Sequence, residues 1–252
     1  MKILINISIL TLLLVMSFSA CKPTEPEKPN TESGKNLVLK FNAMFDDKPL
    51  SWAGQSITGA GDTVSFDKIK FIMSNFTLET NDGKFITFPE FYGYLSLRTG
   101  RDSVILKNVP EGAYKSIRFM VGLDSATNHS DPNLRSIDHP LKPAVNDMHW
   151  GWAGGYIFNI LEGYYQNNGA TNGFSFHIAN DVNVRNHSFV ESFTIAKNSR
   201  IVFNVNADKY FDNVVKFSLK LDGNVSHSGD VDPIMDKFIK NIPGTISYES
   251  FQ

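Results

Sequence analysis

Apolar and polar residues alternate along much of this chain with a period of two, the pattern that predicts half-buried β-strands. The longest alternating stretch covers residues 64–78. A hairpin turn is predicted at Asn81-Asp82-Gly83-Lys84, because the Asp-Gly pair readily adopts positive φ. Further strands are predicted at 37–43, 85–88, 93–97, 103–106, 114–122, 156–160, 174–178, 192–195, 200–205 and 215–221. Many short strands joined by Gly- and Asn-containing turns favour an all-β fold, an antiparallel β-sandwich.

Helical spacing of apolar residues occurs in only two segments, both near the C-terminus. Residues 207–214 form a short one, and residues 232–242 a longer one that begins with Asp232 as N-cap and Pro233 in the first turn. We therefore expect one or two short helices there. The polar, turn-rich stretch 124–148 matches neither pattern, and a loop of that length inside a domain is usually functional or disordered.

The first 36 residues also depart from the alternation and resemble an export signal followed by a linker. The chain is mostly apolar from Ile3 to Met16, which suits a signal peptide and is shorter than the ~20 residues of a spanning helix. Small residues directly before Cys21 suit a lipoprotein signal peptidase, although Phe18 stands where leucine is more usual. We predict a lipoprotein signal peptide over residues 1–20 and acylation of Cys21; an ordinary signal peptide with an incidental cysteine is the alternative.

Residues 21–36 are rich in proline and glutamate and contain few apolar side chains. Such a segment cannot bury enough surface to offset the entropy of ordering, so it predicts a disordered tether. A single domain over residues 37–252 then follows. The order of lipid, tether and domain predicts a lipid-anchored extracytoplasmic protein, and Lys22 after the cysteine favours the outer membrane or cell surface.

Cysteine usage, charge and motifs exclude several functions. Cys21 is the only cysteine, so the mature domain has no disulfide, thiolate metal site or cysteine nucleophile. A formal net charge of −2 without a basic patch argues against nucleic acid as a partner. The chain carries none of the common nucleophile, metalloprotease or phosphate-loop motifs, so we do not expect an enzyme.

The densest chemical signal is the run Met148-His149-Trp150-Gly151-Trp152. In an extended chain Met148, Trp150 and Trp152 share one face and His149 points to the other. His177 stands on the strand predicted at 174–178, on the face opposite its aromatic residues. Spacing alone favours tryptophans that pack in the core or at a sheet edge and a surface histidine at 177. Glu162 is interpreted as structural, and three further histidines in turn-like segments as surface residues: His129, His139 and His187.

Several motifs in order along residues 37–250 resemble one known family. They are Met148–Trp152, Gly155-Tyr156, Glu162-Gly163, Phe176-His177-Ile178 and Val225-Ser226-His227-Ser228, with looser similarity at 72–76 and 111–114. Together they resemble the methanobactin-associated, MbnP-like periplasmic copper-binding proteins. The resemblance is most specific at the Trp-x-Trp segment.

This resemblance implies a β-sandwich that binds copper. It implies His177 and His227 as imidazole ligands, and Trp150 or Trp152 as a residue oxidised to kynurenine by a partner dihaem enzyme of the cytochrome-c-peroxidase type. His149 replaces the more usual aromatic residue and is a further candidate ligand. Val225 stands where a methionine often precedes the late His-Ser pair, so Met148 is the candidate sulfur ligand.

Ligand chemistry agrees with copper but does not choose it alone, because imidazoles also suit Zn²⁺. Two functional classes therefore remain. The first is a metal-binding protein, most simply for copper, in acquisition, storage or delivery. The second is a non-catalytic interaction module that docks a protein or glycan through the long loop and the tryptophan pair.

Overall fold

The computed structural model describes residues 34–151, 154–229 and 231–252, which belong to the unit Ser33–Gln252. The predicted signal peptide, Cys21 and nearly all of the tether lie outside the described residues, as does Trp152. No helix in the described ranges is both long and apolar enough to cross a membrane.

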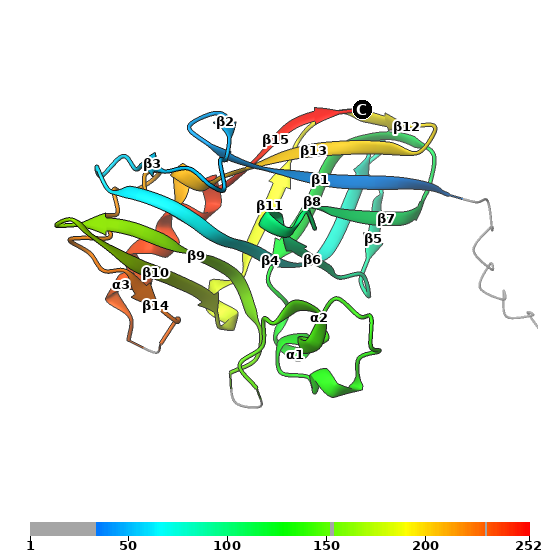
Figure 1. Cartoon of the computed structure of the whole chain (residues 1–252). Coiled ribbons are helices and arrows are strands. Elements are labelled where there is room, and N and C mark those ends of the chain that lie inside the picture. Colours follow the sequence, from blue (N-terminus) through cyan, green and yellow to red (C-terminus); the bar gives the residue numbers. More distant parts are fainter. Residues whose placement is uncertain (1–33, 152–153, 230) are drawn as a thin grey trace, which may run out of the picture. The chain divides into compact units, whose positions relative to one another are not determined.

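Two β-sheets form the fold (Figure 1). The smaller has the order β15-β13-β1-β2, with β7 also paired to β1; the larger has the order β11-β8-β4-β9-β10-β14, with four further strands paired to β4 or β8. The smaller sheet comprises β1 (Lys35–Phe45), β2 (Lys48–Pro49), β7 (Ser103–Val109), β13 (Ser199–Asn206) and β15 (Ile246–Phe251). The larger comprises β3 (Ser56–Ile57), β4 (Thr63–Thr80), β5 (Phe85–Phe88), β6 (Gly93–Ser96), β8 (Gly112–Val121), β9 (Ile157–Asn167), β10 (Ala170–Ala179), β11 (Arg185–Phe189), β12 (Phe193–Ile195) and β14 (Val225–Ser226).

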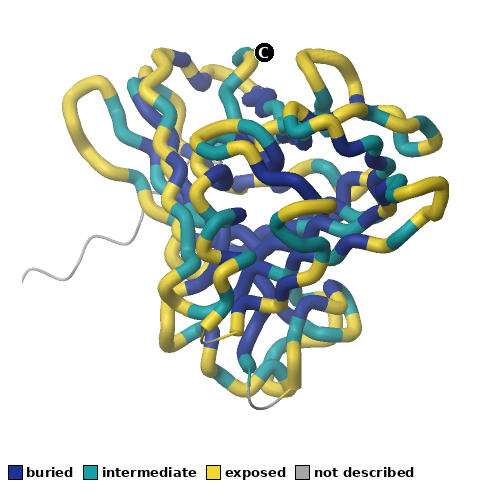
Figure 2. The backbone as a smooth tube through the Cα atoms, turned by 90° about the vertical axis from the view of Figure 1, so that its left-hand side faces the viewer, coloured by how far each residue is buried: buried dark blue, intermediate teal, exposed yellow. Residues whose placement is uncertain are grey.

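This architecture confirms the predicted β-sandwich. The sheets are mixed rather than wholly antiparallel, because β1 pairs with β13 and β10 pairs with β14 in parallel; the other described pairings are antiparallel. The main core lies between the sheets, where alternate residues of facing strands meet, as in the edge-to-face contact of Phe41 on β1 with Phe119 on β8 at 6.0 Å. Each such buried aromatic contributes about 1.5–3 kcal/mol by leaving water. Figure 2 shows the buried segments gathered inside and the exposed ones at the periphery.

The C-terminal helix is also confirmed. It comprises α3 (Pro233–Phe238) and a 3-10 extension, η5 (Ile239–Gly244), and the Asp232 carboxylate caps it by accepting the Met235 N–H at 2.9 Å. The segment 207–214 contains only a single 3-10 turn, η4 (Ala207–Tyr210). Two more 3-10 turns are η1 (Leu97–Thr99) and η3 (Asp181–Asn183).

The strand predicted at 215–221 is wrong, because this segment joins neither sheet and forms only an isolated bridge between Lys216 and Asp212. The backbone N–H groups of Val214 and Val215 donate instead to the side-chain oxygen of Asn241, each at 2.9 Å. Phe217 is fully buried and meets Phe238 of α3 edge to face at 5.2 Å. The alternation of apolar residues here reflects burial beneath the helix rather than a strand.

The long stretch 124–148 is ordered. It contains α1 (Ser125–Asn128), η2 (Pro132–Leu134) and α2 (Pro143–Asn146), which lie together beside one end of the larger sheet (Figure 1). A second, smaller core supports it: Ile72, Tyr92, Tyr94, Leu123, Leu141, Met148, Tyr156, Ile157, Phe158 and Ile160. Of the two alternatives for this loop, functional or disordered, the disordered one is therefore excluded. The ordered loop lines a pocket described below.

His187, interpreted from the sequence as a surface residue, is instead buried. It lies on β11 and stacks on Phe119 with ring centroids 5.5 Å apart, and its Nε2 has no hydrogen-bond partner. Burial, with a smaller effect of the Arg185 charge, lowers the pKa of His187 from 6.5 to about 4. Between these values the unfolded chain binds a proton that the folded protein does not. Stability therefore rises with pH across this interval and is fully present above about pH 6.5.

We predict that His187→Phe flattens this part of the pH dependence. The pKa shift corresponds to about 3 kcal/mol of stability that wild type loses between pH 6.5 and 4. Urea unfolding of both proteins at pH 7.5, 5.5 and 4.5 would measure it, with the variant gaining relative to wild type as the pH falls. Parallel pH profiles for the two proteins would show that His187 is not the responsible group.

Candidate functional site

The fold brings His177 and His227 side by side, although 49 residues separate them in the chain. Strand β10 pairs in parallel with β14, matching Ser175 with Val225 and Phe176 with Ser226. A histidine follows each pairing, His177 within β10 and His227 directly after β14, and the two imidazole rings are nearly parallel, with centroids 4.7 Å apart and an interplanar angle of 14°. His177 points away from the core because its neighbour Phe176 fills it, stacking on Phe238 at 4.1 Å.

A serine and an asparagine hold this short parallel pair together. The Ser228 hydroxyl donates to the His177 carbonyl at 2.9 Å and accepts the Ala179 N–H at 3.1 Å. The Asn180 side-chain amide donates to the Ser228 carbonyl. Both Asn180 (φ +69°) and Ser228 (φ +54°) adopt left-handed backbone conformations, which cost about 1–3 kcal/mol each unless their surroundings enforce them. These contacts set the position of His177 relative to His227.

A row of polar side chains crosses three strands next to His177. Lys68 on β4 lies opposite Glu162 on β9, which lies opposite Ser175 on β10. Glu162 places one carboxylate oxygen 2.7 Å from the His177 Nε2 and the other 2.8 Å from the Lys68 ammonium. Ser175 Oγ is 3.2 Å from the same Nε2. The other ring nitrogen of His177, Nδ1, is buried and has no hydrogen-bond partner.

The charges in this row shift the pKa values of its members. Burial acts to raise the pKa of Glu162, but the hydrogen bonds from Lys68 and His177 outweigh it and lower the pKa overall. The hydrogen bond to Glu162 raises the pKa of Lys68. Burial and then the neighbouring His177 lower the pKa of His227, against the pull of Glu162 and Asp232. Glu162 and Lys68 therefore remain a charged pair at neutral pH.

Trp150 completes the cluster. Its ring centroid lies 6.2 Å from the His177 ring and 6.2 Å from the His227 ring, and the side chain is 36 % exposed. The backbone N–H of Trp150 donates to the Gly155 carbonyl at 3.0 Å, so the segment turns back on itself there. Trp150, His177 and His227 thus come together from three distant parts of the sequence.

Two other predicted site residues lie elsewhere. Met148 is fully buried in the smaller core. His149 forms an isolated bridge with Tyr156 and packs edge to face on its ring at 4.6 Å, away from the histidine pair that Trp150 approaches. Burial lowers the pKa of His149, against the pull of Asp131.

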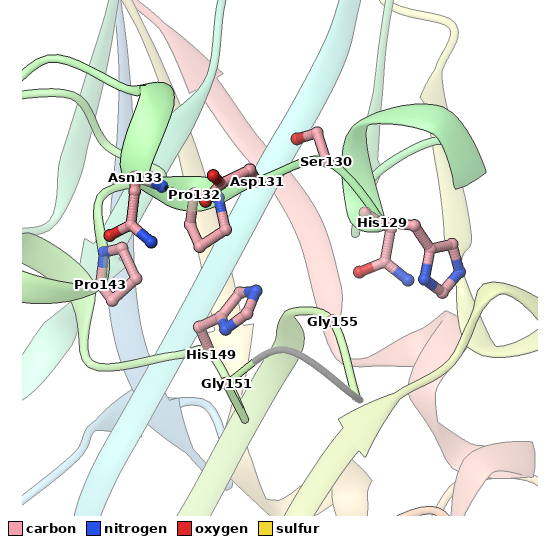
Figure 3. Close-up of a pocket in the computed structure, with 10 residues that line it drawn as sticks. His129, Ser130, Asp131, Pro132, Asn133, Pro143, His149, Gly151 and Gly155 are labelled. Atoms are coloured by element: carbon pink, nitrogen blue, oxygen red, sulfur yellow. Dashed lines mark hydrogen bonds between the residues drawn. The ribbon is translucent and has the colours of Figure 1, made fainter.

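His149 lines an open pocket of about 610 Å³ formed by the 124–148 stretch and the glycines at 151 and 155. In Figure 3 its ring points into this pocket beneath Asp131 and Pro132, with His129 at one side and Pro143 at the other. His129 lies 3.3 Å from the Asp181 carboxylate. Two imidazoles, those of His129 and His149, line this pocket, and neither His177 nor His227 does.

In the part of the chain that the structure describes, no three His, Cys, Asp or Glu side chains are grouped to hold one metal ion. The histidine pair brings two imidazole rings together, with Trp150 beside them. Sequence reasoning interpreted Glu162 as structural and did not single out Lys68, Ser175, Asn180 or Ser228. Strand alternation places Ser175 on the same face as His177, but the partners across the sheet depend on register, which the sequence did not specify.

The fold is that of a known class of β-sandwich proteins. A model of the MbnP protein family matches residues 34–228. The chain belongs to the MbnP family. Among solved structures, MbnP from Methylosinus trichosporium is similar, with 15% sequence identity, a TM-score of 0.53, and coverage of 78% of this chain and 82% of that one. At that identity the likeness concerns the fold. No curated protein sequence matches the chain.

Proposed function

We propose that this protein is a membrane-anchored extracytoplasmic metal-binding protein that takes copper for acquisition, storage or delivery. The observation that carries the proposal is the near-parallel pair of His177 and His227 beside Trp150. Membership of the MbnP family and the resemblance of these motifs to copper-binding members support copper.

The donor set fits a metal ion. A buried polar atom without a partner costs about 1–3 kcal/mol, and the Nδ1 of His177 is such an atom. A metal that accepts its lone pair would remove this cost. Imidazole is a good ligand for copper, which stands at the top of the divalent affinity order, and Zn²⁺ is the competing metal.

Trp150 is the proposed third contributor. An intact indole offers only an N–H donor, whereas kynurenine offers an amine and a ketone with lone pairs. Of the two tryptophans that the sequence nominated, Trp150 lies against both histidine rings. The oxidation needs a strong oxidant, for which we propose the partner dihaem enzyme of the cytochrome-c-peroxidase type.

We propose no catalytic role for the histidine site. Ser175, His177 and Glu162 have the residue types of an acyl-transfer triad, but Ser175 and Glu162 both approach Nε2 of the same ring. A triad needs the carboxylate on one ring nitrogen and the nucleophile on the other. The carboxylate here orients the ring instead.

Copper binding should depend on the histidine pair. His177→Ala and His227→Ala should each lower copper affinity by about 100-fold or more, because the loss of a residue that only orients a metal ligand already costs about 10–100-fold. His129→Ala and His149→Ala, in the separate pocket, serve as matched controls and should bind as wild type. Titration against a competing chelator measures this. Wild-type protein that binds neither copper nor zinc would instead favour the interaction-module hypothesis.

Trp150 should carry the modification in the native host. The change to kynurenine adds one oxygen and removes one carbon, about 4 Da on the peptide that contains Met148 to Tyr156. Protein made without the partner oxidase should keep the indole and bind copper through histidines alone. Trp150→Phe should abolish the mass shift, while Trp52→Phe should retain it. Native protein with unmodified Trp150 would disprove the kynurenine part of the proposal.

The anchor is proposed at Cys21, in the outer membrane or at the cell surface. Cleavage after residue 20 and acylation would leave residues 22–36 as a tether to the domain. Cys21→Ser should accumulate as an uncleaved precursor that incorporates no radiolabelled fatty acid, whereas wild type incorporates it. Equal labelling of the two proteins would contradict the anchor.

A further inference from the structure

The two ring nitrogens of His177 have opposite surroundings. Nε2 is within hydrogen-bond distance of the Glu162 carboxylate, at 2.7 Å, and of the Ser175 hydroxyl, at 3.2 Å. Nδ1 is buried without a hydrogen-bond partner. His227 differs from both, because its side chain is exposed and, among the described residues, no hydrogen bond reaches its ring.

We propose that Glu162 is a positioning residue that holds His177 in its Nε2–H tautomer and thereby makes Nδ1 the atom that faces the metal. An ionised carboxylate is only an acceptor, so at 2.7 Å the nitrogen beside it must carry the proton. A neutral imidazole has one N–H, which leaves the lone pair on Nδ1. This inference rests on the proposed function and assigns the ligand atom within it.

Glu162 is itself fixed. Its second carboxylate oxygen contacts the Lys68 ammonium at 2.8 Å, and the two residues lie opposite each other on β4 and β9. With one oxygen bound to Lys68, the other is directed to His177 on the next strand. Metal-binding histidines commonly donate their second N–H to a carboxylate, which fixes the ring orientation and raises its basicity. Lys68 is thus a second positioning residue, acting through Glu162.

The two histidines consequently have different roles. The side chain of His177 is held in one orientation, because its ring contacts Glu162 and its backbone carbonyl accepts a hydrogen bond from Ser228. The side chain of His227 is free to change its rotamer, because its ring is exposed. It would turn toward a metal ion that Nδ1 of His177 has bound first. The ring centroids are 4.7 Å apart and the rings are nearly parallel, so the exposed ring of His227 must turn before a nitrogen of each ring can lie about 2 Å from one ion.

The test uses the full chain and the variants Glu162→Gln and Lys68→Met. Glu79→Gln is the matched control, because Glu79 is also a strand carboxylate of the larger sheet, paired with Lys115 and Arg118. Long-range ¹H–¹⁵N spectra of the metal-free protein report the tautomer of each histidine. Copper titration against a chelator reports affinity.

We expect wild-type His177 to carry its proton on Nε2 before any metal is added. Glu162→Gln should give a mixture of tautomers, because a glutamine can also donate, and should weaken copper binding about 10- to 100-fold. Lys68→Met should act in the same direction, and Glu79→Gln should change neither readout. An Nδ1-protonated His177, or unchanged affinity in Glu162→Gln, would overturn this inference alone. Wild-type protein that binds no copper would overturn the proposed function and, with it, the ligand role of Nδ1.

Discussion

The parallel contact between β10 and β14 is only two residue pairs long, and the histidine site depends on it. So short a ladder would be marginal by itself. The Ser228 hydroxyl reinforces it by donating to the His177 carbonyl and accepting the Ala179 N–H. The Asn180 side chain, directly after β10, adds a hydrogen bond to the Ser228 carbonyl. Two residues in left-handed backbone conformations are retained at this point. Strain concentrated where two candidate ligands meet is typical of a functional site, because the geometry there is maintained against its local cost.

Packing on the opposite face of β10 holds the histidine site in place. Phe176 stacks on Phe238 of α3, so β10 is anchored in the core one residue before His177. Alternation along a strand therefore couples the packing of the sandwich to the orientation of the site. The row of Lys68, Glu162 and Ser175 extends this coupling across β4, β9 and β10, where strand register places each side chain opposite the next. One face of the larger sheet packs in the core, and the other face carries the side chains of the site.

Two neighbouring residues, His149 and Trp150, face different environments. Trp150 faces the histidine pair, whereas His149 faces the open pocket formed by the 124–148 stretch. Asn128 links the pocket wall to this segment by accepting the Tyr156 N–H at 2.8 Å, and a Cβ at Gly155 would come within 2.7 Å of the same oxygen. The long loop is therefore a support for the segment that presents Trp150. This accounts for an ordered structure in a stretch whose composition alone suggested only a loop.

The sequence by itself determined the β-sandwich, the hairpin at residues 81–84 and the C-terminal helix with its Asp232 cap, because each follows from local periodicity, turn chemistry or capping. It misjudged residues 215–221 and His187, where burial beneath a helix or between aromatic rings depends on segments distant in the chain. Motif resemblance nominated His177, His227, Trp150 and His149 together. Only the tertiary structure decided that the first three meet while His149 faces another pocket, and that the Glu162 carboxylate lies within hydrogen-bond distance of His177. Such contacts depend on strand register and on a parallel pairing across 49 residues. Local pattern specifies which face a side chain occupies, but not which distant strand lies beside it.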